Sequence, residues 1–224
     1  MRRENEIENF AIAMYNKYGD SHPTAEYLIS CYEACIPKTF WNVSSEDVVH
    51  NVDVFNRVVI PYRKKWKQAL RNGYSILFLG DSGLGKTFFI SYILTQMIKR
   101  NLTVYYTTLT QFDMDIKRGF HDSNADQRLE LMLESDFVSI DEIGKQYVKG
   151  EGFITVRFEH YLKKRYDNGE PVILSSNMNR EDLFSLYGPT VKSMVEGKYL
   201  EVSLEPGDYR KVMRRKMKKE MNYK

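Results

Sequence analysis

One short stretch, residues 78–91, restricts the possible folds more than any other part of the sequence. It reads FLGDSGLGKTFFIS, and Gly80, Gly85, Lys86 and Thr87 fit the phosphate-binding loop (P-loop) pattern G-x-x-x-x-G-K-[ST]. The apolar run YSILFLG leads into it, and the apolar segment KTFFISYILTQMIKR follows at helical spacing. A P-loop works only between a buried strand and a helix. The sequence therefore predicts an α/β protein that binds a nucleoside triphosphate.

The P-loop also predicts how phosphates and a metal ion are held. Its glycines let successive backbone N–H groups point at phosphate oxygens, and the helix start adds the positive end of its dipole. Lys86 is expected to reach the β- and γ-phosphates, and Thr87 to hold Mg²⁺ through its hydroxyl. The predicted nucleotide-binding residues are Gly80, Asp81, Ser82, Gly83, Leu84, Gly85, Lys86 and Thr87.

Hydrolysis needs more than a P-loop, and residues 136–144 (DFVSIDEIG) offer the missing carboxylates. An apolar run ends here in Asp141 and Glu142, where ligands of open α/β sheets bind. We expect Asp141 to be the Walker B acid on Mg²⁺ and Glu142 to be the base that activates water. A solvated pair opening a loop is the ordinary alternative, but it fits poorly downstream of a P-loop. A separate Glu beside the Asp favours an ATPase over a GTPase, so the predicted cofactors are ATP and Mg²⁺.

A third apolar run, PVILSSNMN at residues 171–179, ends in small polar residues. Asn177 is expected beside Glu142 at the same edge of the sheet, where it could hold the attacking water or sense the γ-phosphate. An ordinary turn asparagine is the alternative.

The alternation of strands and helices predicts a three-layer P-loop fold around a parallel, five-stranded sheet. Helices are expected between the first four strands. Only 47 residues follow Asn177, which leaves no room for the helical lid domain of many AAA+ ATPases. The expected strands lie near residues 75–80, 103–108, 136–141, 171–176 and 198–203.

Four regions are predicted along the chain. The first is a short helical N-terminal segment, and the second is a connector with a helical stretch around residues 53–71. The ATPase core and a basic tail follow. The boundaries are residues 1–40, 41–72, 73–210 and 211–224.

Charge and composition limit the possible partners and cellular location of the protein. The tail RKVMRRKMKKEMNYK holds eight basic residues and one acid, which leaves 25 basic and 29 acidic residues elsewhere. Such a block suits nucleic acid or an acidic partner, and a solvated helix end is the equal alternative.

Because no apolar run approaches the roughly 18 residues of a membrane span, no membrane partner and a cytoplasmic location are expected. Cys31 and Cys35 are expected on one helix as buried free thiols.

From about residue 33 to residue 213 the chain resembles the DnaC/DnaI-type helicase loaders of bacteria and phages. These are AAA+ ATPases without a lid, and their relatives include the IstB transposition helper. The stretches EACIPKTFWN, GDSGLGKTFF, DFVSIDEIG, KKRYDNGEPVILSSNMN and EPGDYRKV are similar to the family's motifs in the same order. The combination of IDEIG, RYDNGEPVILSSN and DYR is more specific than the P-loop alone. Arg210 matches the family's sensor 2 arginine, which acts at the catalytic site.

The resemblance implies a loader of a replicative hexameric helicase of the DnaB type, bound through the N-terminal segment. It also implies single-stranded DNA binding by the ATPase domain, ATP as a switch, and self-association. In the family the DNA contacts lie largely between the second strand and Walker B. For the same region of this chain, a surface helix with a buried Phe that makes no DNA contact is the alternative, and the residues slightly favour it. The residues of that region with suitable cations and rings are Phe112, Lys117, Arg118 and Phe120.

The chain departs from the family pattern in two places. The N-terminal segment is shorter than in many members and lacks a zinc site. Loaders also carry an arginine finger before sensor 2, where this chain has TVKSMVEG with Met194 at the arginine's place. No arginine occurs between Arg180 and Arg210, and Lys192 and Lys198 are the nearby cations.

Two other functions stay open. An IstB-like transposition helper would act on duplex DNA, and a P-loop small-molecule kinase would transfer phosphate to an acceptor. The kinase is disfavoured because no obvious lid or acceptor motif is found, and because IDEIG with Asn177 suits an ATPase.

Overall fold

A parallel sheet of five strands, in the order β2-β3-β4-β1-β5, forms the centre of the computed structural model. The structure describes residues 25–118, 123–144 and 152–207, with isolated positions 9, 12, 214, 217, 218 and 221. Every strand begins within one residue of its expected start, so the predicted sheet is confirmed. The strands are β1 (Ser75–Leu79), β2 (Val104–Thr108), β3 (Phe137–Ile143), β4 (Val172–Ser176) and β5 (Tyr199–Ser203).

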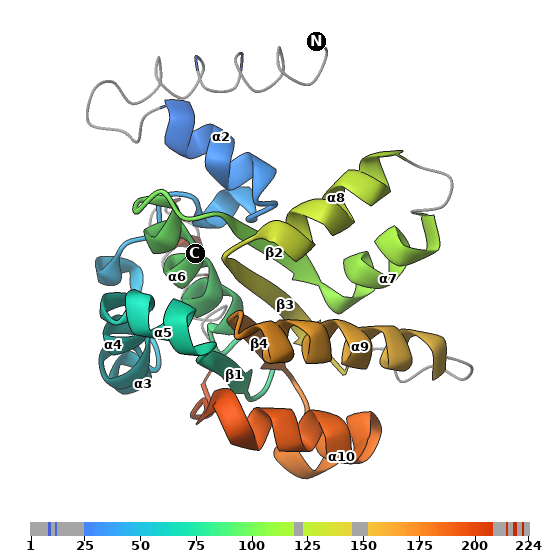
Figure 1. Cartoon of the computed structure of the whole chain (residues 1–224). Coiled ribbons are helices and arrows are strands. Elements are labelled where there is room, and N and C mark those ends of the chain that lie inside the picture. The colour runs from blue at the N-terminus through green and yellow to red at the C-terminus, as the bar shows by residue number, and fades with distance from the viewer. Residues whose placement is uncertain are drawn as a thin grey trace.

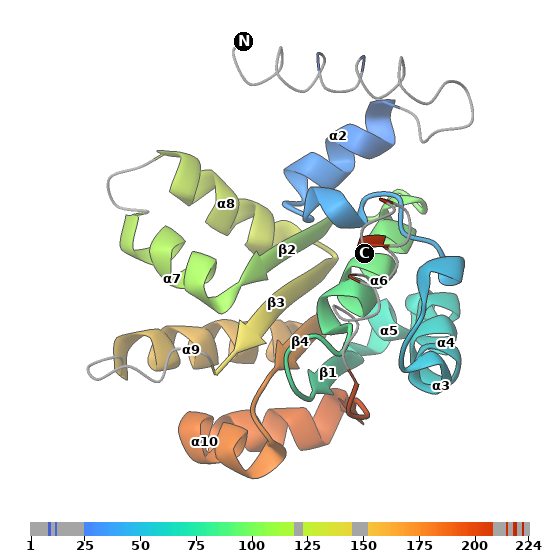
Figure 2. The same cartoon turned by 180° about the vertical axis from the view of Figure 1, so that it is seen from behind.

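Helices cover both faces of the sheet, which makes the three predicted layers (Figure 1, Figure 2). On one face, α6 (Lys86–Ile98) shares a buried cluster with α2 (Ala25–Glu33), the 3₁₀ turn η2 (Lys38–Phe40) and the helices before β1. These are α3 (Val52–Val54), the π-turn η4 (Phe55–Val59), α4 (Ile60–Lys64) and α5 (Trp66–Asn72). The other face carries α7 (Leu109–Arg118), α8 (Ser123–Glu134), α9 (Gly152–Asn168) and α10 (Arg180–Lys198).

Alternation along β1 shows why the sheet needs cover on both sides. Ile76 and Phe78 pack into the cluster around α6, whereas Leu77 and Leu79 pack into the cluster around α7–α10. All five residues of β1 are buried. Each fully buried side chain of this kind contributes roughly 1.5–3 kcal/mol. This continuous apolar run is the pattern expected of a parallel strand that is covered on two faces.

The helical stretch expected at residues 53–71 is broken into pieces. Pro61 has no N–H for the turn before it, and that turn, η4, is a π-helix. The chain breaks again at Lys65, whose φ of −96° and ψ of 25° are not helical. Val59 and Ala69 in these pieces are buried, while most of the basic residues among them are exposed.

The N-terminal segment is attached to the main domain where it is described. The carbonyl of Ala34 accepts the N–H of Tyr106 on β2 at 2.8 Å, and α2 packs against α6. Cys31 is a buried free thiol as expected, but Cys35 is an exposed one, so that part of the prediction is wrong. The reason is that α2 ends at Glu33, and Cys35 adopts a left-handed φ of 57°. The helix expected before Gly19 lies outside the described residues.

The sequence analysis did not foresee α10, which connects β4 to the edge strand β5. Its N-cap is Asn179, whose side-chain oxygen accepts the N–H of Asp182 at 2.8 Å. The helix is kinked at Gly188, just before Pro189. Among the helices of the described ranges, none combines the length and the apolar character that a bilayer crossing requires.

Candidate ATP-binding site

The P-loop lies at the carboxyl end of β1 and turns into α6. Gly85 is the N-cap of α6 with a left-handed φ of 97°, which favours glycine. Lys86 is the first helical residue, and its ammonium donates to the carbonyl of Gly80 and, at 2.7 Å, to that of Asp81. The side chain is thus folded back into the loop, 6% exposed, where phosphate oxygens can replace these carbonyls.

Four donors orient the carboxylate of Asp141. Its Oδ2 accepts the hydroxyl of Thr87 at 2.7 Å and the phenol of Tyr106 at 2.8 Å. Its Oδ1 accepts the hydroxyl of Ser175 and, at 2.9 Å, the backbone N–H of Glu142. Burial above all, then the negative charges of Asp141 and Glu142, raise the pKa of Tyr106, so its phenol stays a donor. Sequence reasoning missed Tyr106 and Ser175, because nothing in the spacing places either side chain on this carboxylate.

A β-bulge turns Glu142 toward the same pocket as Asp141. Consecutive residues of a regular strand point to opposite faces. Here Ile140 pairs with Leu174 but Ile143 pairs with Ser176, so β3 holds one residue more than β4 between these pairs. Glu142 is the bulged residue, with a left-handed φ of 60°. Both carboxylates therefore line one pocket.

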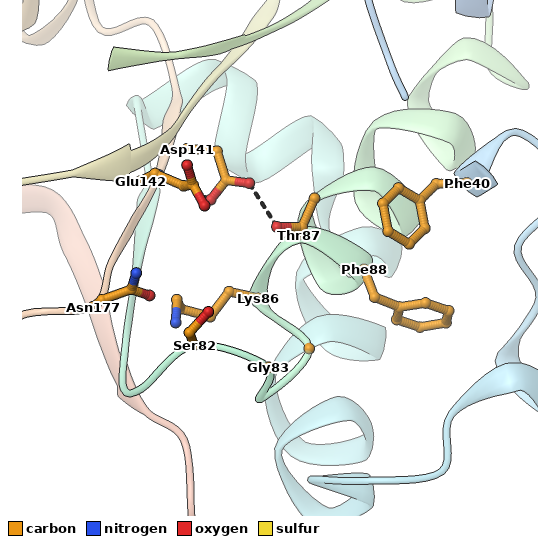
Figure 3. A pocket seen from close by; sticks show the side chains of 10 residues that line it. Phe40, Ser82, Gly83, Lys86, Thr87, Phe88, Asp141, Glu142 and Asn177 are labelled. Atoms are coloured by element: carbon orange, nitrogen blue, oxygen red, sulfur yellow. Dashed lines mark hydrogen bonds between the residues drawn. The ribbon is translucent and has the colours of Figure 1, made fainter. Parts of the chain in front are cut away.

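Figure 3 shows the pocket that these elements enclose, with Thr87 facing Asp141 and with Asn177 on the side of Ser82 and Lys86. Its volume is about 180 Å³, which suits a triphosphate and a metal ion better than a whole nucleotide. Phe40 and Phe88 flank it, and their rings meet edge to face at 6.4 Å. The predicted site residues that line this pocket are Ser82, Gly83, Gly85, Lys86, Thr87, Asp141, Glu142 and Asn177.

The residues present fit a magnesium ion. Mg²⁺ prefers oxygen ligands, and the hydroxyl of Thr87 and the carboxylate of Asp141 already meet at hydrogen-bond distance. These two groups come from α6 and β3, 54 positions apart in the chain. The sheet rather than local sequence therefore brings them together.

Four residues in and just after α7 were predicted to contact DNA. Phe112 is 3% exposed, and the centroid of its ring lies 5.5 Å from that of Tyr161. The preferred interpretation of a surface helix with a buried Phe is therefore confirmed, and Phe112 as a base-stacking residue is wrong. Lys117 is exposed but forms an ion pair with Asp113 in the preceding turn. Arg118 is exposed at the end of the helix. Phe120 and the sensor residue Arg210 lie outside the described residues.

The structure describes Met194, at the position aligned with the arginine finger, and the two lysines near it. Met194 is 6% exposed in the cluster between α10 and the sheet. Lys192 is exposed on the same helix, with its Nζ 4.0 Å from Glu196. Lys198 donates to the carbonyl of Tyr166 at 3.0 Å. The position aligned with the finger therefore faces the core rather than a neighbouring subunit.

Comparison with known proteins places the chain in a family. Residues 66–192 match the model of the IstB-like ATP binding protein family. The putative ATP-binding protein of insertion sequence IS5376 from Geobacillus stearothermophilus is 28% identical over 121 residues. That alignment covers 52% of this chain and 45% of the relative. The chromosomal replication initiator protein DnaA of Helicobacter pylori is 24% identical over 58% of this chain and 28% of its own length. The chain thus spans less than half the length of these curated relatives.

Solved structures share the fold. The DnaC helicase loader superposes with a TM-score of 0.65 at 18% identity, covering 75% of this chain and all of that one. DnaI superposes with a TM-score of 0.61 at 18% identity, covering 79% of this chain and 98% of the other. Domain III of DnaA from Thermotoga maritima gives 0.63 at 21% identity, covering 84% and 77%.

The predicted resemblance and fold class are both confirmed. The family match covers more than half of the chain, and the P-loop and the two Walker B carboxylates face one pocket. The DnaC helicase loader and domain III of DnaA share the fold of this chain. This chain therefore belongs to the IstB-like ATP-binding protein family, with a P-loop α/β fold.

Proposed function

We propose that the chain binds ATP with Mg²⁺ in this pocket and hydrolyses it slowly, as a switch in the initiation of DNA replication. The observation that carries the proposal is the convergence of Lys86, Thr87, Asp141, Glu142 and Asn177 on one pocket. A pocket that only bound nucleotide would not need a second, separately oriented carboxylate.

Each side chain has a distinct role in the proposed reaction. Lys86 exchanges its loop carbonyls for the β- and γ-phosphate oxygens, while Thr87 and Asp141 hold the metal ion. The ion, when bound, neutralises charge that develops on the transferred phosphoryl group. Glu142 takes a proton from the attacking water, and Asn177 positions that water or the γ-phosphate. Arg210, matched to sensor 2 by resemblance, adds a cation to the same phosphates.

Phe40 offers a place for the adenine base. It is half-buried, lines the pocket, and stands edge-on to Phe88, which is 5% exposed. The base can stack on the accessible Phe40 ring while the phosphates lie in the P-loop. Phe40→Ala is expected to weaken ATP binding and to leave the binding of inorganic triphosphate unchanged. Equal losses for both ligands would contradict this placement.

A helicase loader fits the motif set and the replication proteins among the relatives. DnaA, a replication initiator, is a sequence relative, and the DnaC helicase loader and DnaI share the fold. The proposed partners are a replicative helicase of the DnaB type and single-stranded DNA, with self-association on ATP. The N-terminal region, residues 1–40, is the proposed helicase-binding segment, ahead of a core at residues 73–210.

A transposition helper acting on duplex DNA is the second candidate. The family name and the IS5376 relative favour it, because that relative belongs to an insertion sequence. DNA preference separates the two candidates, since a loader binds single strands and a helper binds duplex.

The experiments test first the ATP site and then the loader role. ATP binding and turnover are measured for the wild-type chain and for Lys86→Ala, with Lys163→Ala on the exposed side of α9 as the matched control. We expect Lys86→Ala alone to lose at least tenfold in ATP affinity, because it removes charge-assisted bonds to phosphate. Unchanged affinity would refute the site. Pull-down with a hexameric helicase, and competition between single-stranded and duplex DNA, then test the loader role.

A further inference from the structure

The helices before β1 carry a run of basic residues. Between Asp53 and Asp81 the sequence has six basic residues and no acid. Arg63 is half-buried, with its guanidinium bonded to the hydroxyl of Tyr92 at 3.0 Å and to Gln96 at 3.1 Å. The other five are exposed and form what we call the α4–α5 basic face: Arg57, Lys64, Lys65, Lys67 and Arg71.

This charge is not neutralised from within the described ranges. Among those residues, no carboxylate forms an ion pair with any member of the α4–α5 basic face. Lys67 lies over the ring of Trp66, 5.5 Å from its centroid. Five like charges on adjacent turns repel one another, and an anionic partner removes that repulsion. The face therefore suits a polyanion.

A cavity of about 460 Å³ opens beside the face, between α4–α5 and the starts of β1 and β5. Tyr74 is 51% exposed at this cavity, and its carbonyl accepts the buried hydroxyl of Tyr62 at 2.7 Å. That bond fixes the wall and leaves the Tyr74 ring accessible. The lining includes aromatic rings and cations and no acid; those that matter here are Arg57, Tyr62, Lys65, Tyr74, Lys198 and Tyr199.

The cavity is separate from the ATP site. It opens at Ser75, where β1 begins, whereas the P-loop starts at Gly80, where β1 ends. The five residues of β1 put about 17 Å between the two. Figure 1 shows α4 and α5 outside α6, away from α7 and α8. A ligand on this face therefore leaves the nucleotide pocket open.

We propose that the α4–α5 basic face binds single-stranded DNA. The phosphate backbone runs along α4 and α5, and one unstacked base enters the tyrosine-lined cavity beside Tyr74. Cations that follow a backbone and rings that stack on bases are the two elements of single-strand binding. Duplex DNA keeps its bases stacked and cannot fill the cavity. The choice of DNA as the polyanion rests on the proposed function.

The experiment measures binding of a fluorescent oligothymidine across a range of salt concentrations, using the full chain with ATP. The patch variant Lys64→Gln/Lys65→Gln/Arg71→Gln is compared with Lys99→Gln/Lys163→Gln/Lys164→Gln, which removes the same charge elsewhere. We expect the patch variant alone to flatten the slope of log K against log salt by about 2, at roughly 0.7 per phosphate contact. Tyr74→Ala is expected to lose at least about fivefold in affinity, through lost stacking. ATP turnover without DNA is expected to stay unchanged in all these variants.

The outcomes separate this inference from the proposed function. If the wild-type chain binds oligothymidine and the patch variant keeps both its slope and its affinity, the inference is wrong and the loader role survives. If the wild-type chain binds no single strand, the loader role fails together with the inference. Duplex binding equal to single-strand binding, with no effect of Tyr74→Ala, would overturn the single-strand assignment. A patch variant that loses only the binding of an acidic peptide such as polyglutamate would identify a protein-docking surface instead.

Discussion

The phenol of Tyr106 donates a 2.8 Å hydrogen bond to Oδ2 of Asp141, the oxygen that also accepts the hydroxyl of Thr87. Tyr106 is 8% exposed and belongs to β2, the strand next to β3. A residue outside every recognised motif therefore helps to orient the proposed metal ligand.

Tyr106→Phe is expected to weaken the binding of Mg²⁺ that supports ATP turnover. Removing one hydrogen bond of roughly 0.5–1.5 kcal/mol loosens the carboxylate and raises the half-saturating Mg²⁺ concentration two- to tenfold. Titration of Mg²⁺ at saturating ATP measures this shift. Tyr105→Phe is the matched control, because the Tyr105 hydroxyl lies near Cys35 rather than Asp141. If both variants keep the wild-type Mg²⁺ dependence, the Tyr106 bond has no role in holding the metal.

Glu142→Gln is expected to bind ATP normally and to turn it over about 10²–10⁴ times more slowly. The amide keeps the size of the side chain, and Asp141 keeps its hydrogen bonds to Thr87 and Tyr106, but the proton acceptor is lost. Single-turnover hydrolysis beside an ATP-binding titration separates the two effects, with the exposed Glu181→Gln as the control. Turnover at the wild-type rate would exclude Glu142 as the base.

Hydrolysis is expected to be slow and to rise little as the protein concentration increases. An arginine finger from a neighbouring subunit is worth about 10³–10⁵ in rate. Met194 holds the aligned position and is buried, and a lysine lacks the planar fork of arginine. Turnover is measured against protein concentration, with and without single-stranded DNA. A steep rise that Lys192→Ala removes would show that this lysine serves as the finger.

Arg165→Met is expected to lower the free energy of unfolding by about 2–4 kcal/mol. The guanidinium is fully buried and donates to the carbonyls of Ser135, Asp136 and Pro171, at the starts of β3 and β4. The arginine of the RYDNGEPVILSSN motif thus joins two strands and does not reach the nucleotide pocket. Urea unfolding compares it with Lys164→Met, an exposed change on the same helix. A loss below 1 kcal/mol would contradict this structural role.

Much of the fold follows from the sequence by itself. A continuous apolar run before a glycine-rich loop specifies a buried parallel strand, as at β1, and three further runs give β2, β3 and β4 within a residue or two. The same local pattern placed Lys86 and Thr87 at a helix start and Asp141 near a strand end. These predictions succeeded because strand burial and the P-loop turn depend on neighbouring residues in the chain.

Tertiary structure decided what depends on which strands are neighbours. Because β3 lies between β2 and β4, Tyr106 and Ser175 meet Asp141 from opposite sides, and spacing along the chain does not reveal this order. The bulge that turns Glu142 into the pocket comes from the register between β3 and β4. Packing against α9 buries Phe112, and folding exposes the α4–α5 basic face beside its cavity. Sequence patterns describe what each segment can bury, while only the packed sheet determines which side chains then meet.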